Sequence, residues 1–120
     1  QIQIPVISYA ATDSDLSNKV AYPTFYRTVP SDNSAALAIV NLFNRFNWSS
    51  CIVIYQNDVY GSNGAKIINE ALTSNGLTVV ETLLYDMASR RIQENLKSTL
   101  VKSASRIVIL WAEYPNAADI

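Results

Sequence analysis

The clearest structural signal in the chain is a short apolar run, Cys51-Ile52-Val53-Ile54-Tyr55. Its shortness and β-branched residues favour a strand, and its lack of polar alternation is typical of a strand buried on both faces. Similar segments follow at 77–84 and 106–111, and amphipathic helical patterns separate the three. This order predicts parallel strands joined by helical crossovers.

The segments on either side extend the same pattern. Residues 4–8 and 25–28 are further candidate strands, and we expect helices over 31–46, 62–74 and 90–102. The apolar residues of each helix share one face and are expected to point inward: Ala36, Ile39, Val40 and Phe43, then Ala65, Ile68 and Leu72, then Ile92, Leu96 and Leu100. The second helix should end at Asn75-Gly76, because glycine readily adopts the left-handed conformation. The sequence thus predicts an α/β fold with open, doubly wound parallel sheets.

Composition excludes several classes of protein. The 120 residues are 49% hydrophobic and 16% charged, which excludes a disordered tail or a coiled coil. Nine basic residues never cluster, so a nucleic-acid surface is not expected. The chain has no histidine and one cysteine, which leaves no histidine-based catalysis, internal disulfide or multi-thiolate zinc site. We therefore predict no metal, no cofactor and no nucleic-acid partner.

An enzyme is also not expected. The carboxylates of Asp13, Asp15 and Glu113 could form acid–base pairs, but acidic residues in loops are usually solvated turn formers. Cys51 opens an apolar strand, which favours an inert buried thiol over a nucleophile. With three glycines, the chain has neither a phosphate-binding loop nor a dinucleotide fingerprint. No catalytic residue is predicted.

The chain is expected to be a piece of a longer protein. It opens directly into strand-like residues with no secretory leader and stops in the first turn of a helix-like segment. No apolar run approaches the ~20 residues of a membrane-spanning helix. Any contact with a membrane is therefore expected through segments outside this chain.

Three polar side chains each follow the end of a predicted strand: Thr12, Asp32 and Tyr60. Because parallel strands end at one edge of a sheet, these side chains could converge on one crevice. A hydroxyl, a carboxylate and an aromatic face together suit a ligand's ammonium group. Each also has a structural alternative: Thr12 can cap a turn, Asp32 can cap a helix, and Tyr60 can pack over a helix start. The residues alone leave both interpretations open.

The tract Asn47-Trp48-Ser49 matches the sequon for N-glycosylation. Asn47 is accordingly a candidate glycosylation site. Trp48 is expected to fill the junction between the preceding helix and the following strand.

Three blocks carry a resemblance to a known family. They are Ile4-Pro5-Val6-Ile7-Ser8-Tyr9-Ala10-Ala11-Thr12 through Leu16-Ser17, then residues 22–32, then Asn47-Trp48 with Tyr60-Gly61-x-x-Gly64. In this order they resemble the ligand-binding region of class C G-protein-coupled receptors, of the metabotropic glutamate and GABA-B type. That family has the type 1 periplasmic-binding-protein fold. It shares this fold with natriuretic-peptide receptors, ionotropic glutamate receptor amino-terminal domains and bacterial amino-acid binding proteins.

The resemblance implies the central part of a two-lobed clamshell. Residues 1–46 would belong to lobe 1 and residues 47–120 to lobe 2, with the hinge near Asn47. Ligand would bind between the lobes and the receptor would signal by lobe closure.

The resemblance also implies roles for individual residues. Thr12 and Asp32 would hold the α-ammonium group of an amino-acid-like ligand, and Tyr60 would close onto it. Ala10 and Ala11 would adjoin the ligand, with Ala10 standing where metabotropic receptors often carry serine. GABA-B receptors that bind GABA have histidine at the position of Val29.

We therefore expect the extracellular ligand-binding region of a dimeric plasma-membrane receptor. Two alternatives keep the fold. One is the ectodomain of a natriuretic-peptide-type receptor cyclase or the amino-terminal domain of an ionotropic glutamate receptor, which would bind peptide or assemble subunits. The other is a periplasmic amino-acid-binding protein that feeds a transporter.

Overall fold

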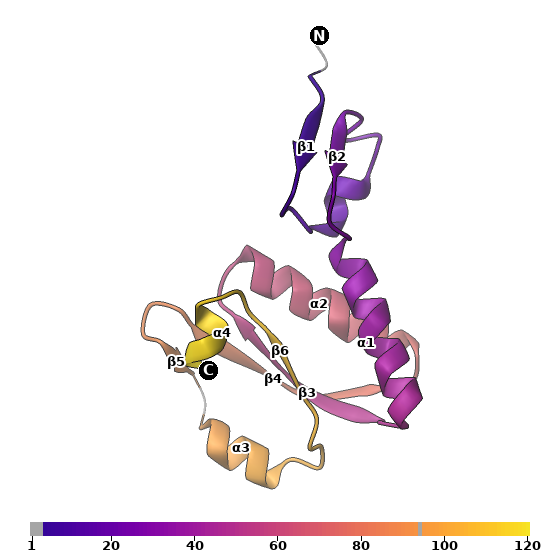
Figure 1. Ribbon diagram of the computed structural model, residues 1–120. Coiled ribbons are helices and arrows are strands. Elements are labelled where there is room, and N and C mark those ends of the chain that lie inside the picture. The colour runs from indigo at the N-terminus through magenta and orange to yellow at the C-terminus, as the bar shows by residue number, and fades with distance from the viewer. Residues whose placement is uncertain (1–3, 94) are drawn as a thin grey trace.

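A computed structural model describes residues 4–93 and 95–120, which form two β-sheets with helices packed on the second (Figure 1). The elements are β1 (Val6–Ser8), the short 3-10 helix η1 (Ser14–Ser17), β2 (Phe25–Arg27), α1 (Asp32–Phe46), β3 (Ser50–Gln56), α2 (Val59–Ser74), β4 (Thr78–Asp86), β5 (Arg91–Ile92), α3 (Leu96–Lys102), β6 (Val108–Trp111) and α4 (Asn116–Asp119). No helix in the described ranges is long and apolar enough to cross a membrane.

The first sheet consists of β1 and β2, which pair in parallel with Val6 opposite Phe25 and Ser8 opposite Arg27. This pair stands apart from the second sheet, and α1 runs from β2 towards the rest of the molecule (Figure 1). Its apolar side chains are largely uncovered, with Val6 51% and Ile7 73% exposed.

The second sheet has the strand order β5-β4-β3-β6, with β3 parallel to both of its neighbours. Successive residues of β3 point to opposite faces, and Cys51, Ile52, Val53 and Ile54 are all buried. Helices lie on both faces of this sheet: α1 and α2 on one, and α3 on the other. The predicted α/β class, with parallel strands and helical crossovers, is confirmed.

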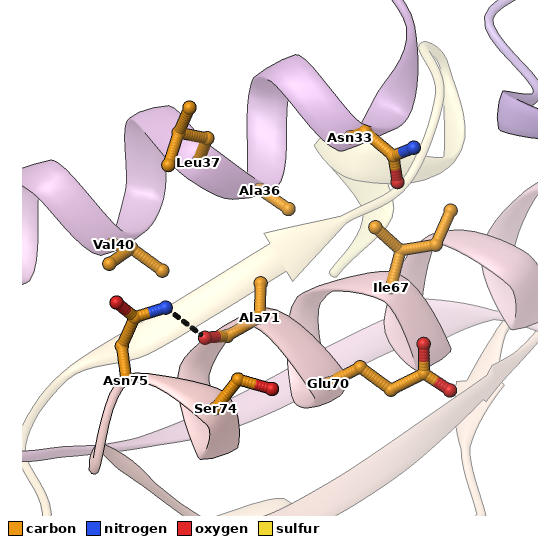
Figure 2. Close-up of a pocket in the computed structure, with 9 residues that line it drawn as sticks. All are labelled: Asn33, Ala36, Leu37, Val40, Ile67, Glu70, Ala71, Ser74 and Asn75. Carbon is orange, nitrogen blue, oxygen red and sulfur yellow. Dashed lines mark hydrogen bonds between the residues drawn. The ribbon is translucent and has the colours of Figure 1, made fainter.

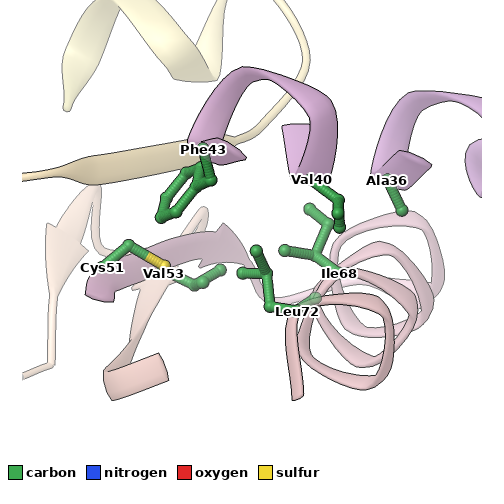
Figure 3. Close-up of a cluster of buried hydrophobic side chains, with 8 residues drawn as sticks. Ala36, Val40, Phe43, Cys51, Val53, Ile68 and Leu72 are labelled. Carbon is green, nitrogen blue, oxygen red and sulfur yellow. The ribbon is translucent and has the colours of Figure 1, made fainter. Parts of the chain in front are cut away.

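The larger core lies on one face of β3, between the sheet and helices α1 and α2 (Figure 3). Its buried members from the helices are the inward positions that helical periodicity predicts: Ala36, Val40 and Phe43 from α1, then Ala65, Ile68 and Leu72 from α2. Cys51 and Val53 complete the contact from β3. Cys51 is 0% exposed, and burial raises the pKa of its thiol to about 11, as expected of an unreactive cysteine.

The opposite face of β3 holds a smaller cluster of Ile52, Ile54 and Leu83. The three apolar residues predicted to share an inward face, Ile92, Leu96 and Leu100, do pack there, together with Ile120. This face is covered by α3 and the end of the chain.

The junction after α1 contains the glycosylation sequon. Asn47 ends the helix in the left-handed conformation, with φ 54°, and its side chain is exposed. Trp48 meets Phe43 edge to face at 5.6 Å and stacks on Phe46 at 5.0 Å. The predicted packing of Trp48 between helix and strand is confirmed.

The prediction of a single helix over 90–102 is wrong at its start. Arg91 and Ile92 form β5, which pairs antiparallel with β4, and α3 begins only at Leu96. The physical reason is a tight turn closed by Asp86, whose carboxylate accepts hydrogen bonds from the Ala88 amide (3.1 Å) and the Ser89 hydroxyl (2.7 Å). One edge of the sheet is therefore antiparallel.

Helix α2 begins three positions earlier than predicted, at Val59 instead of Ser62. Asp58 precedes it and accepts a hydrogen bond from the Gly61 amide at 2.7 Å through Oδ1. Aspartate is a common N-cap, so the sequence does indicate that the helix begins directly after Asp58.

Candidate functional site

A cavity of about 220 Å³ lies where the loop after β1 meets the first turns of α1 and α2 and the loop after β6. Its lining includes all five residues predicted as ligand contacts, namely Ala10, Ala11, Thr12, Asp32 and Tyr60. The other lining residues are Asp13, Val59, Asn63 and Glu113. The convergence expected from the ends of the strands is therefore present.

The loop that carries Ala10, Ala11 and Thr12 is held from both strands of the first sheet. The Ser8 hydroxyl oxygen accepts hydrogen bonds from the amides of Ala10 (3.3 Å) and Ala11 (3.0 Å). Arg27, in β2, donates through Nη1 to the carbonyls of Ala11 (3.2 Å) and Asp13 (2.8 Å). These bonds give the loop a defined shape at the rim of the cavity.

Asp32 is the first residue of α1 and is only 5% exposed. The N-cap is Ser31, and no side-chain hydrogen bond or ion pair of Asp32 occurs within residues 4–93 and 95–120. Asp32 is therefore not the helix cap in this structure. Its position in the first turn of α1 still favours a negative charge, because of the helix dipole. Its carboxylate is available to a ligand.

Thr12 is tied to Asp32 through the backbone, because the Asp32 amide donates to the Thr12 carbonyl at 2.9 Å. The neighbouring turn is closed by Asp13, whose Oδ1 accepts from the Asp15 amide at 2.9 Å. No hydrogen bond involving the Thr12 hydroxyl occurs within the described part of the chain. The turn-cap role therefore falls to Asp13, and Thr12 lines the cavity.

Tyr60 both packs and lines the cavity. Its ring stacks on Trp111 of β6, with centroids 5.4 Å apart and planes inclined by 22°. Burial raises the pKa of its phenol, and the negative charges of Asp32, Glu113 and Asp58 raise that pKa further. The Tyr60 ring therefore lies in the negative electrostatic field of three carboxylates.

Glu113 is one of the lining residues that sequence reasoning missed. It follows β6, so the rule that selected Thr12, Asp32 and Tyr60 also applied to it. We expected a solvated loop carboxylate, and the side chain is indeed exposed, but it lies at the cavity. The missed signal was its position after the last strand.

A second missed residue, Asn63, joins the two parts of the molecule. Its Nδ2 donates to Oδ2 of Asp13 at 3.2 Å, so α2 is linked to the loop after β1. Both residues line the cavity. The bond crosses from the first sheet's loop to the second sheet's helix.

The lining groups suit one kind of ligand chemistry. Three carboxylates, a hydroxyl and an aromatic face favour a small cationic group over an anion. No group of three or more metal-ligating side chains is gathered within 4–93 and 95–120. The carboxylates and the aromatic face suit an organic cation such as an ammonium.

A groove of about 310 Å³ between α1 and α2 has different chemistry (Figure 2). Its floor is formed by apolar side chains such as Ala36, Val40 and Ile67, and Glu70 is its one charged residue. None of the predicted ligand contacts lines it. The smaller cavity, which all five predicted ligand contacts line, is therefore the better candidate site.

Comparison with known proteins agrees with the prediction that this chain is part of a receptor. A family model described as "Receptor family ligand binding region" matches residues 1–120. Similar proteins include metabotropic glutamate receptor-like protein E of Dictyostelium discoideum, 30% identical over 93% of this chain. Others are taste receptor type 1 member 3 of Rattus norvegicus, 28% identical over 91%, and the probable metabotropic glutamate receptor mgl-1 of Caenorhabditis elegans, 33% identical over 88%.

The chain spans only a small share of these relatives, 14%, 13% and 10% of their lengths. All three are receptors by name, in agreement with the prediction of a receptor segment and not an enzyme.

Proposed function

This chain belongs to the family of receptor ligand-binding regions, and from that premise we propose that the cavity lined by Thr12, Asp32 and Tyr60 binds an amino-acid-like ligand. The chain would form part of the extracellular region of a plasma-membrane receptor similar to class C G-protein-coupled receptors. The metabotropic glutamate and taste receptors among its relatives support this branch over the cyclase, ionotropic and periplasmic alternatives.

The observation that carries the proposal is the carboxylate of Asp32, a residue only 5% exposed, which lies beside Thr12 and Tyr60 and has no partner among residues 4–93 and 95–120. A carboxylate with little access to solvent attracts a cation more strongly than an exposed one, because less water screens it. An α-ammonium group would pair with Asp32, donate a hydrogen bond to the Thr12 hydroxyl and face the Tyr60 ring. Glu113 adds a further negative charge from the loop after β6.

Two lobes that close on the ligand are part of the proposal. The sequence predicted a boundary at 46/47, but the packing of α1 in the larger core supports a boundary before Asp32. On that division Thr12 lies in lobe 1, while Asp32 and Tyr60 lie in lobe 2. A ligand that contacts both lobes favours closure. The size of that shift equals the difference between its binding free energies for the closed and the open form.

A receptor dimer and a glycan on Asn47 are proposed on the family resemblance and the sequon. Exposure of Asn47 at the end of α1 is compatible with a glycan. A fall in mass after enzymatic deglycosylation, absent in Asn47→Gln, would establish the modification, and an unchanged mass would exclude it.

The test is calorimetric titration of the complete ligand-binding region with L-glutamate, GABA and a panel of other amino acids. Asp32→Asn keeps the size of the side chain and removes its charge. Losing a charge-assisted hydrogen bond costs about 1.5–3 kcal/mol, or roughly 10- to 100-fold in affinity. We expect a loss of that size for whichever amino acid binds.

The matched control is Asp15→Asn, because Asp15 is an exposed acid in η1 that does not line this cavity. Its effect should stay within about twofold. Equal effects of the two substitutions would refute the assignment of Asp32. No binding across the panel by a folded region would favour a peptide-binding or assembly role.

A further inference from the structure

Gln56 is a buried polar side chain at the carboxyl end of β3, where it is 1% exposed. Its Oε1 accepts hydrogen bonds from the Glu113 backbone amide (2.8 Å) and from Nδ2 of Asn116 (3.2 Å). Its Nε2 donates to Oδ2 of Asp58 at 2.7 Å. One side chain thus joins the loop after β6 to the start of α2.

These contacts suit a carboxamide. Asp58 accepts from a donor and the Glu113 amide donates to an acceptor, and the amide of Gln56 presents both groups at its end without carrying a charge. A glutamate at position 56 would set a second carboxylate against Asp58. A methionine of similar length would leave buried polar groups without partners.

Both segments that Gln56 holds carry residues of the candidate site. Asp58 caps α2 through its other oxygen, which fixes the turn that contains Tyr60. Glu113 is itself held by its backbone amide, while its side chain is exposed at the cavity. The packing is close, since a methyl group on Gly61 would come within 2.9 Å of Cγ of Gln56.

We propose that Gln56 is a positioning residue for amine recognition, which sets the spacing between Glu113 and Tyr60. The inference rests on the function proposed above and adds a residue that does not line the cavity. Without these hydrogen bonds the Glu113 loop would sample more positions, and its charge would act less strongly on the ligand. The role lies in the loop's placement and needs no contact with the ligand.

The test uses Gln56→Met in the complete ligand-binding region, with L-glutamate as the calorimetric probe. We expect L-glutamate to bind at least about tenfold more weakly. Gln93→Met is the matched control: the same chemical change, at an exposed side chain with no hydrogen bond of its own in the described part of the chain. Its effect should stay within about twofold.

A double-mutant cycle separates positioning from general damage. If Gln56 acts through Glu113, then Gln56→Met should cost less than about threefold once Glu113→Gln is present. If the double variant instead loses affinity for L-glutamate by the full product of the two single losses, the two residues act independently. That result would overturn the proposed role of Gln56 through Glu113.

Hydrogen exchange gives a readout that does not depend on ligand. The Glu113 amide should exchange faster in Gln56→Met, while amides within β3 keep their wild-type rates. Unchanged exchange at Glu113 in Gln56→Met would overturn the positioning role.

The two proposals fail in different ways. Faster exchange at Glu113 with unchanged L-glutamate affinity would overturn the recognition role of Gln56 alone. Failure of the wild-type region to bind L-glutamate or any other amino acid would overturn the proposed function, and the recognition role with it. The exchange data would then still show whether Gln56 places the loop.

Discussion

At the scale of single residues, the motif Tyr60-Gly61-x-x-Gly64 has a steric explanation. A methyl group at Gly61 would overlap the carbonyl of Gln56, and one at Gly64 would overlap the indole of Trp111. Both glycines therefore allow α2 to approach the sheet closely enough for Tyr60 to stack on Trp111. A pattern that marks the family in sequence is here a requirement for close packing.

Gly64→Ala is expected to destabilise the complete ligand-binding region by about 1–3 kcal/mol, the usual cost of overpacking a tight contact. It should also displace Trp111 and weaken the stack beneath Tyr60. Urea unfolding measures the first effect, and the fluorescence of the tryptophans reports the second. Ser62→Ala, at an exposed position of the same helix, serves as the control and should change stability by less than about 0.5 kcal/mol. Equal stability of Gly64→Ala and wild type would contradict the packing argument.

At the scale of elements, the turn between β4 and β5 brings Arg91 and Ile92 back against β4 as a strand, and α3 begins only after its N-cap, Asn95. Hydrogen bonds from the Ser89 hydroxyl and the Ala88 amide hold the pKa of Asp86 below its ordinary value, with Asn57 as a further donor. The ionised carboxylate organises this turn, which reverses the chain before the helix. Local polar chemistry therefore overrides the helical periodicity of residues 90–102.

The lowered pKa of Asp86 makes this turn sensitive to acid. Its stabilisation should be complete above the ordinary carboxyl pKa and disappear as the pH falls through the lowered value, because the folded turn binds the ionised form. Exchange or NMR shifts of the Ala88 amide should show the transition, and Asp86→Asn should abolish it. A turn whose Ala88 signal is unaffected by pH in this range would refute the assignment.

At the scale of the whole molecule, the two sheets differ in how well they are supported. The second sheet has helices on both faces, whereas the first has two strands of three residues with exposed apolar side chains. The described residues extend over 56 × 35 × 19 Å, a shape with little shared core. Isolated two-stranded sheets are marginal in water.

The 120-residue chain on its own should therefore show unequal protection. We expect backbone amides in β1 and β2 to exchange much faster than those in β3, and the difference to shrink in the complete ligand-binding region, where more chain is available to cover the first sheet. Hydrogen exchange with mass spectrometry measures both. Equal protection of the two sheets in the 120-residue chain would contradict this view of the fold.

The candidate site was only partly predictable. Side chains at the ends of parallel strands converge, which predicts Thr12, Asp32 and Tyr60, and all three line the cavity. Glu113 meets the same criterion, but nothing in the local sequence distinguishes a solvated loop acid from one that lines a cavity. Gln56 had no signal, because its role depends on contacts with Glu113 and Asn116, which lie 57 and 60 positions away.

The sequence by itself determined the class of fold and the inward faces of its helices, because hydrophobic periodicity is a local property that the backbone geometry converts directly into burial. It also contained the ordered motifs by which the family is recognised. Tertiary structure alone decided that α1 packs with the second sheet, that β5 replaces the start of a helix, and that Gln56 links two sides of the cavity. These outcomes depend on partners far apart in the chain, and no local pattern encodes which distant groups will meet.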